Sequence, residues 1–189
     1  MEIKEGIIKL EKHLSPLDQF VLDFIRVLGN REYVLVSGYV SILFGRARSS
    51  EDIDLLLSAM QKDEFLELFD ELDKAGFECI NVERDTAFSY LLQNTAVRFS
   101  RKGSVLPNME VKFAKSFMSL VAVKDKIRVD IGKDSLFISP IELQIAYKRE
   151  CLKSDKDVED ALHLEIVFEG NISKEKLKKY EYLIEQHGC

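Results

Sequence analysis

Two carboxylates, Asp52 and Asp54, begin a stretch over 52–57 that is otherwise apolar and is predicted to form a strand. Because successive strand residues point to opposite faces, both carboxylates would lie on the same face. Shortly upstream, Ser37 and Gly38 follow another apolar stretch and precede a short helix. Backbone N–H groups at a helix start are free to hold an anion. A carboxylate pair beside such a turn suits a metal-bound triphosphate.

A third carboxylate on a neighbouring strand would complete this site. Mg²⁺ prefers a few carboxylates together with phosphates and waters, and nucleotidyl transfer depends mainly on that ion and on alignment of the reactants. Glu110 is the preferred candidate, because alternation over 108–114 places it on the strand face opposite Met109 and Val111. Asp130 is the second candidate, and the sequence alone does not decide between them.

Two segments resemble a known family. The first is V-S-G at 36–38 followed, after a helix, by R-S-S-E-D-I-D-L at 48–55. It resembles the signature of polymerase-β-type nucleotidyltransferases: Gly-Gly or Gly-Ser, a gap, then aspartates alternating with hydrophobic residues. The second segment, 138–164, contains S-P-I-E-L, a lysine and K-D-x-x-D. It is similar to the end of the AbiEii-type branch, which includes toxin nucleotidyltransferases, and the resemblance spans about residues 33 to 165.

The resemblance assigns roles to individual residues. Those implied to bind metal, as two Mg²⁺ ions, are Asp52, Asp54 and Glu110. Those implied to bind the nucleotide are Ser37, Gly38, Arg48, Ser50 and Lys148. The implied catalytic set is Asp52, Asp54, Glu110, Lys148 and Asp157. Lys148 would reach the nucleotide phosphates, Asp157 would order that lysine, and Glu110 would also serve as a base for the acceptor hydroxyl.

The activity implied is Mg²⁺-dependent transfer of a nucleoside monophosphate from a nucleoside triphosphate to a hydroxyl of an RNA end, a protein or a small molecule. The toxin-like branch implies an antitoxin partner. Two departures favour an alternative, a catalytically inactive protein of this fold that binds a nucleotide or a partner. Ser37 replaces the first glycine, and Lys112 shares a face with Glu110, where its ammonium could occupy the metal's place. A third interpretation is an interaction domain whose acidic strand end is incidental.

Composition limits the class of protein. The chain has 189 residues, of which 46% are hydrophobic and 32% charged, as expected for one globular domain. The formal net charge of −6 argues against bulk nucleic-acid binding, which needs a basic surface. The absence of a G-K-[S/T] sequence after the glycines disfavours a P-loop kinase.

Interspersed helical and strand patterns predict an α/β or α+β fold: a small mixed sheet with the carboxylates on one face, helices on the other, and a C-terminal helical segment closing a cleft. We expect a single domain over 1–189, divided into N-terminal helices at 1–30, a nucleotidyltransferase core at 31–139 and a helical segment at 140–189. The predicted helices are 3–14, 16–29, 39–44, 61–75, 87–94, 140–152, 155–168 and 173–187. The predicted strands are 33–36, 52–57, 77–83, 96–101, 108–114, 126–131 and 135–138.

The three cysteines are odd in number and widely spaced, which predicts neither a metal knuckle nor a disulfide framework. A reducing, cytoplasmic location fits this pattern. No apolar run approaches the ~18 residues that suggest a membrane span, so no contact with a membrane is expected.

Overall fold

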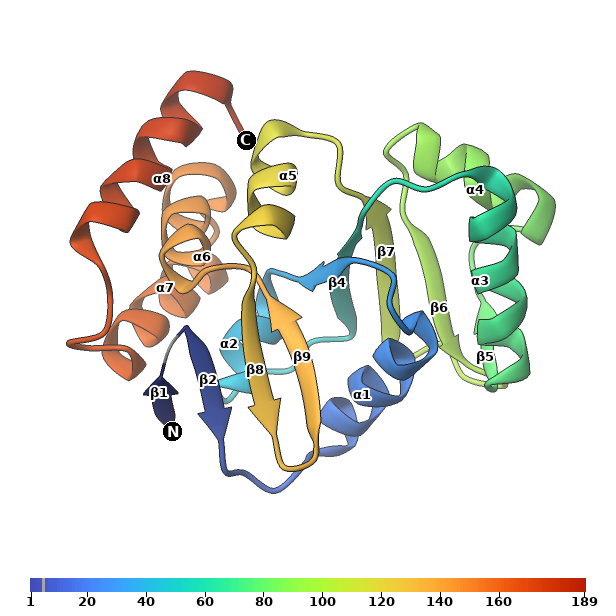
Figure 1. Cartoon of the computed structure of the whole chain (residues 1–189), viewed down its shortest axis with the longest axis horizontal. Helices are drawn as coiled ribbons and strands as arrows, with labels where there is room; N and C mark the ends of the chain where they lie inside the picture. The colour runs from blue at the N-terminus through green and yellow to red at the C-terminus, as the bar shows by residue number, and fades with distance from the viewer. Residues whose placement is uncertain (5) are drawn as a thin grey trace.

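A computed structural model describes residues 1–4 and 6–189. Within them the strands form one mixed sheet in the order β1-β2-β8-β9-β3-β4-β7-β6-β5 (Figure 1). The strands are β1 (Glu2–Lys4), β2 (Ile7–Leu10), β3 (Tyr33–Leu35), β4 (Asp52–Leu57), β5 (Phe77–Cys79), β6 (Val97–Arg101), β7 (Asn108–Phe113), β8 (Ile127–Ile131) and β9 (Asp134–Ile138). The mixed α/β class is therefore as predicted.

The helices are α1 (Pro16–Leu28), α2 (Gly38–Leu43), α3 (Lys62–Lys74), α4 (Arg84–Leu92), α5 (Phe117–Lys124), α6 (Ile141–Tyr147), α7 (Asp155–Val167) and α8 (Lys174–His187), with a π-helical turn η1 (Lys148–Leu152) continuing α6. The start of α1 shows how local sequence sets a boundary. Ser15 and Asp18 form a reciprocal capping box, and Pro16 occupies the first turn.

The helix predicted over 3–14 is wrong, because this segment forms β1 and β2. Gly6 has a φ of +76°, and Lys4 pairs with Ile7 in an antiparallel hairpin. β2 then pairs in parallel with β8, and Ile8 is buried. The apolar spacing here fits either structure, and a strand partner far along the chain decides between them.

Helix α5 was not predicted. Its sequence, F-M-S-L-V-A-V-K, is apolar on nearly every side and so lacks the one-sided pattern that indicates a surface helix. Ser116 begins it by accepting a hydrogen bond from the Ser119 backbone N–H.

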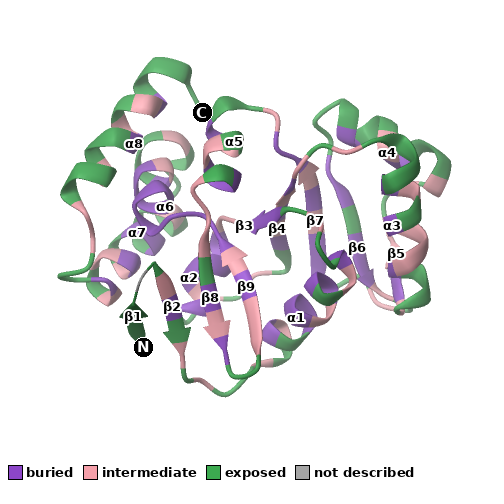
Figure 2. Cartoon of the chain, in the orientation of Figure 1, coloured by how far each residue is buried: buried purple, intermediate pink, exposed green. Residues whose placement is uncertain are grey.

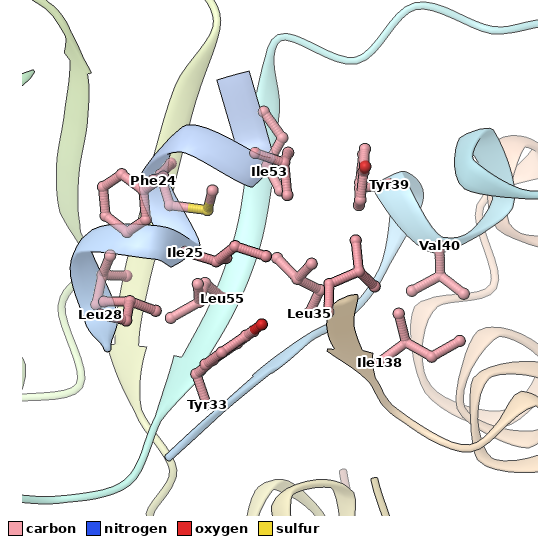
Figure 3. Packing of buried hydrophobic residues seen from close by; sticks show 14 of the residues in the cluster. Phe24, Ile25, Leu28, Tyr33, Leu35, Tyr39, Val40, Ile53, Leu55 and Ile138 are labelled. Atoms are coloured by element: carbon pink, nitrogen blue, oxygen red, sulfur yellow. The ribbon is translucent and has the colours of Figure 1, made fainter. Parts of the chain in front are cut away.

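Apolar side chains fill both faces of the sheet. On one face the predicted inward residues of β4 and β7 are all buried: Ile53, Leu55, Leu57, Val111 and Phe113. Figure 3 shows Phe24, Ile25 and Leu28 of α1 packed over Ile53 and Leu55. On the opposite face a second cluster joins β3 to α5, α6 and α8. Figure 2 shows the central strands largely buried and the outer helix surfaces exposed.

The prediction that no disulfide forms is wrong for one pair. Cys151 in η1 is bonded to Cys189, with 5.6 Å between their Cα atoms, and Cys79 is free. The two cysteines are 38 positions apart, and packing of α8 on α6 brings them together. Sequence spacing could not show this pairing. The expectation of a reducing compartment therefore loses the support of unpaired cysteines.

In the residues that the structure describes, every helix is too short or too polar to cross a membrane.

Candidate functional site

Three adjacent strands bring the predicted site residues together. β4 pairs in parallel with β7 so that Asp54 lies opposite Glu110 and Asp52 lies opposite Asn108. On the other side of β4, the Val36 N–H just beyond the end of β3 donates to the Asp54 carbonyl over 3.0 Å. Ser37, the next residue, therefore begins its turn beside Asp54. This juxtaposition is the one that the spacing of the motif suggested.

Of the two candidates for the third carboxylate, only Glu110 lies beside Asp54. Asp130 is on β8, and both β9 and β3 separate that strand from β4. Its side chain accepts a hydrogen bond from Arg128 Nε over 2.7 Å.

The turn at Ser37 and Gly38 is already engaged by protein groups. Ser37 has a φ of +62°, and its backbone N–H donates to Gln144 Oε1 over 3.1 Å. A Cβ on Gly38 would lie 2.9 Å from Arg48 Nη2, so the absence of a side chain lets the guanidinium approach the backbone. A phosphate at this turn would find a positive charge within reach but would compete with Gln144 for the Ser37 N–H.

Glu110 is held by two cations. Lys112 Nζ lies 2.5 Å from Oε1, and Arg98 Nη2 on β6 lies 2.9 Å from Oε2. Burial favours the neutral form of Glu110, but the hydrogen bonds from Lys112 and Arg98 outweigh it and hold the pKa below its ordinary value. Glu110 is therefore ionised near neutral pH, and its low pKa makes it a weak proton acceptor.

Asp54 has the opposite environment. Burial raises its pKa, and the negative charge of Glu110 raises it further, while the Lys112 ammonium and the Ser37 hydroxyl act against the rise. Asp52 is exposed and accepts a hydrogen bond from Asn108 Nδ2 over 2.7 Å. The Ser50 hydroxyl donates to the Asp52 carbonyl over 2.8 Å, so it supports the start of β4.

A buried ion cluster connects the loop before β4 with η1 and α7. Its members are Arg46, Arg48, Lys148, Asp157 and Asp160, and we call it the Asp160 cluster. The Asp160 carboxylate, fully buried, accepts from Arg46 Nε at 2.8 Å, Arg48 Nη1 at 2.6 Å and Lys148 Nζ at 2.9 Å. Lys148 is 1% exposed and also contacts Asp157 over 3.3 Å. The structure thus places Lys148 on α7 carboxylates rather than in an open pocket.

Several residues of this site received no role from sequence reasoning, among them Arg98, Gln144 and Asp160. Arg98 and Gln144 come from separate elements, β6 and α6, and nothing near the motifs signals their approach. Asp160 belongs to the K-D-x-x-D sequence, which was quoted as a motif without a role for its last residue. Only the three-dimensional arrangement shows that it joins the loop before β4 to α7 and η1.

A cavity of about 400 Å³ opens beside the carboxylates. Its polar lining includes Ser37, Asp54, Glu110, Lys112 and Gln144, and its apolar lining includes Met118, Ala122, Leu143 and Tyr147. Since α5 and α6 supply these four apolar side chains, the cavity joins an acidic edge to an apolar wall, a mixture typical of small-molecule sites.

The donor atoms at this edge fit Mg²⁺ brought in with a ligand better than a preformed metal site. In the described part of the chain, no group of three or more His, Cys, Asp or Glu side chains is arranged to hold a metal ion. Asp52 and Asp54 nevertheless offer hard oxygens on one face of β4, and in the described residues neither forms an ion pair with a lysine or arginine. Mg²⁺ is commonly held by one or two carboxylates with substrate phosphates and waters, so two aspartates suffice.

Comparison with solved structures identifies the fold as nucleotidyltransferase-like. The chain is similar to an antigenic nucleotidyltransferase-like protein from Paracoccidioides brasiliensis, with 18% identity, a TM-score of 0.51, and coverage of 92% of this chain and 90% of that one. It also matches JHP933 from Helicobacter pylori at 13% identity and a TM-score of 0.39, covering 92% of this chain and 97% of that one, a score too low to support the fold. No family model matches the chain, and no curated protein matches it.

Proposed function

We propose that this chain binds a nucleoside triphosphate in the cavity beside β4 and β7 and transfers its nucleoside monophosphate to an acceptor hydroxyl. The observation that carries the proposal is the pairing register of β4 and β7, which sets Asp54 opposite Glu110. Asp54 is on β4, the strand that also lies beside the Ser37 turn. If the acidic strand end were incidental, as in a plain interaction domain, Ser37, Asp54 and Glu110 would not be expected to line the same cavity.

Each side chain has a separate task in this proposal. Asp52 and Asp54 would hold Mg²⁺, which when bound offsets phosphate charge and orients the triphosphate. The Ser37 hydroxyl and the Arg48 guanidinium over Gly38 favour phosphate at the turn. Glu110 keeps Arg98 and Lys112 beside the cavity, and its low pKa suits this electrostatic task better than that of a base.

The acceptor is the finer part of the proposal. The resemblance to toxin nucleotidyltransferases points to RNA or protein as the acceptor, with an antitoxin as partner. With a net charge of −6, an RNA acceptor would need a local rather than a global basic surface.

Transfer of label from α-³²P-labelled ribonucleoside triphosphates to total RNA or to cell protein tests this function. Asp54→Asn and Asp52→Asn should each lower the rate by more than the roughly 10–100-fold that loss of an outer-shell partner costs. Asp130→Asn, which alters a carboxylate on the distant β8, is the matched control and should retain the wild-type rate. Equal labelling by wild type and both β4 variants would contradict the proposal.

A second function is favoured by the ion pairs of Glu110, which place an ammonium at a proposed metal ligand. The chain would then be an inactive member of this fold that binds a nucleotide or a partner. Titration calorimetry separates the two functions. Triphosphate binding that strengthens with Mg²⁺ supports transfer, whereas tight binding that is indifferent to Mg²⁺ supports the binding module.

A further inference from the structure

The two cations on Glu110 fill both oxygens of that carboxylate. Lys112 is two residues beyond Glu110 on β7, so both side chains lie on the same face. Arg98 comes from the neighbouring strand, because β6 pairs with β7 in a register that sets Arg98 directly beside Glu110. Lys112 Nζ takes Oε1, and Arg98 Nε and Nη2 both take Oε2, at 3.1 and 2.9 Å. A divalent ion at Glu110 would compete with these donors for the oxygens and would be repelled by both cations.

The two aspartates on β4 differ from Glu110 in their ion pairing. In residues 1–4 and 6–189, neither Asp52 nor Asp54 pairs with a lysine or arginine, whereas Glu110 pairs with one of each. The acidic edge therefore carries three negative charges, and two positive charges gather at one of them. The charge that no side-chain cation pairs with lies on Asp52 and Asp54 of β4. The attraction for a divalent ion is consequently strongest at β4 and weakest at Glu110.

Lys112 is also placed to meet the ligand. Its side chain is 39% exposed, and it lines the same cavity as Glu110 and Asp54. A flexible ammonium at the cavity wall can neutralise phosphate oxygens as a point charge, which is one of the tasks of a metal ion in phosphoryl transfer. The Arg98 guanidinium on β6 adds a second positive charge next to Glu110.

We infer that Lys112 and Arg98 take the place of one of the two divalent ions, so that the site binds a single Mg²⁺, on Asp52 and Asp54, together with the triphosphate. This inference rests on the proposed function, because it concerns the same site. It replaces the expectation of two metal ions with one metal ion and the side-chain cations of Lys112 and Arg98.

Counting bound Mn²⁺ tests the inference without measuring activity. Equilibrium dialysis with electron paramagnetic resonance detection would give the number of Mn²⁺ ions per protein, in the presence of α,β-methylene analogues of the four ribonucleoside triphosphates. We expect one Mn²⁺ per protein for wild type and two for Lys112→Met, because Glu110 Oε1 becomes available. Lys112→Arg keeps the charge and should stay at one.

Lys102→Met is the matched control, since Lys102 forms an exposed ion pair with Asp73, 2.8 Å long, and does not line the cavity. It should bind one Mn²⁺. Two ions on wild type, or one ion on both wild type and Lys112→Met, would overturn the inference and leave the proposed function standing. No ion on wild type with any of the four analogues would overturn both.

Discussion

Two of the groups of ion pairs in this protein, the Asp160 cluster and the pairs around Glu110, differ in how far they are buried. In the Asp160 cluster the central carboxylate and Lys148 are both essentially inaccessible to solvent. Around Glu110 the cations are 39% and 44% exposed and the carboxylate 12%. Charges that water can reach are released at little cost, whereas buried charges must remain paired. The first region is therefore suited to fixing the loop before β4, and the second to exchanging partners with a ligand.

The largest effect is expected from Asp160→Ala. Removing this carboxylate leaves Arg46, Arg48 and Lys148 without their shared buried partner, and breaking a buried ion pair costs about 3–5 kcal/mol. Urea denaturation of wild type and Asp160→Ala would measure the difference in the free energy of unfolding. Glu159→Gln is the control, because Glu159 is an exposed partner of Arg46 and should cost no more than about 1 kcal/mol. Equal losses for both variants would remove the distinction between the regions.

A smaller effect is expected from Gly38→Ala, which probes the connection between the two regions. The added Cβ would lie 2.9 Å from Arg48 Nη2, and Asp160 restrains that guanidinium, so we expect a cost of about 1–3 kcal/mol. Repeating the substitution in an Arg48→Ala background should recover much of this cost. Additive losses in the double variant would show that Arg48 does not crowd Gly38.

The pH dependence of stability should have opposite signs for the two facing carboxylates. The pKa of Glu110 is lowered in the folded state, so its ionised form stabilises the protein above its ordinary value of 4.5, and this contribution is lost as the pH falls through the lowered pKa. The pKa of Asp54 is raised, so wild type loses stability as the pH rises from 3.8 through the raised pKa.

Two substitutions test these signs. Relative to wild type at neutral pH, Glu110→Gln should destabilise the protein and Asp54→Asn should stabilise it, each by an amount set by about 1.4 kcal/mol per pKa unit. Both differences should shrink in acid. Thermal unfolding at several pH values measures them, and a pH-independent difference for both variants would contradict the assigned environments.

Local sequence was sufficient for elements whose signals are contained in a few residues. The helix predicted over 16–29 begins at Pro16, as α1 does, and the alternation over 108–114 placed Glu110 on the correct face of β7. It was insufficient where a distant partner decides the outcome, as for β2, which needs β8, and for the disulfide of Cys151.

The same distinction applies to the site. Strand periodicity predicted that Asp52 and Asp54 share a face, but it left the third carboxylate open between Glu110 and Asp130, because the pairing of β4 with β7 decides that point. It could not predict that Arg98 reaches Glu110 or that Gln144 reaches the Ser37 N–H, because these contacts come from elements 12 and 107 positions away. The motif predicted a role for Lys148, but it could not predict the burial of Lys148 against Asp160, which depends on the docking of α7.

The most direct test of the central claim, that the Asp54 and Glu110 edge holds a metal-bound triphosphate, is a crystal structure with Mn²⁺ and a non-hydrolysable triphosphate. The account predicts an anomalous peak between Asp52 and Asp54, with phosphate density reaching the turn at Ser37 and Gly38. Ordered nucleotide bound elsewhere, or bound in the cavity with no metal peak at these aspartates, would contradict it.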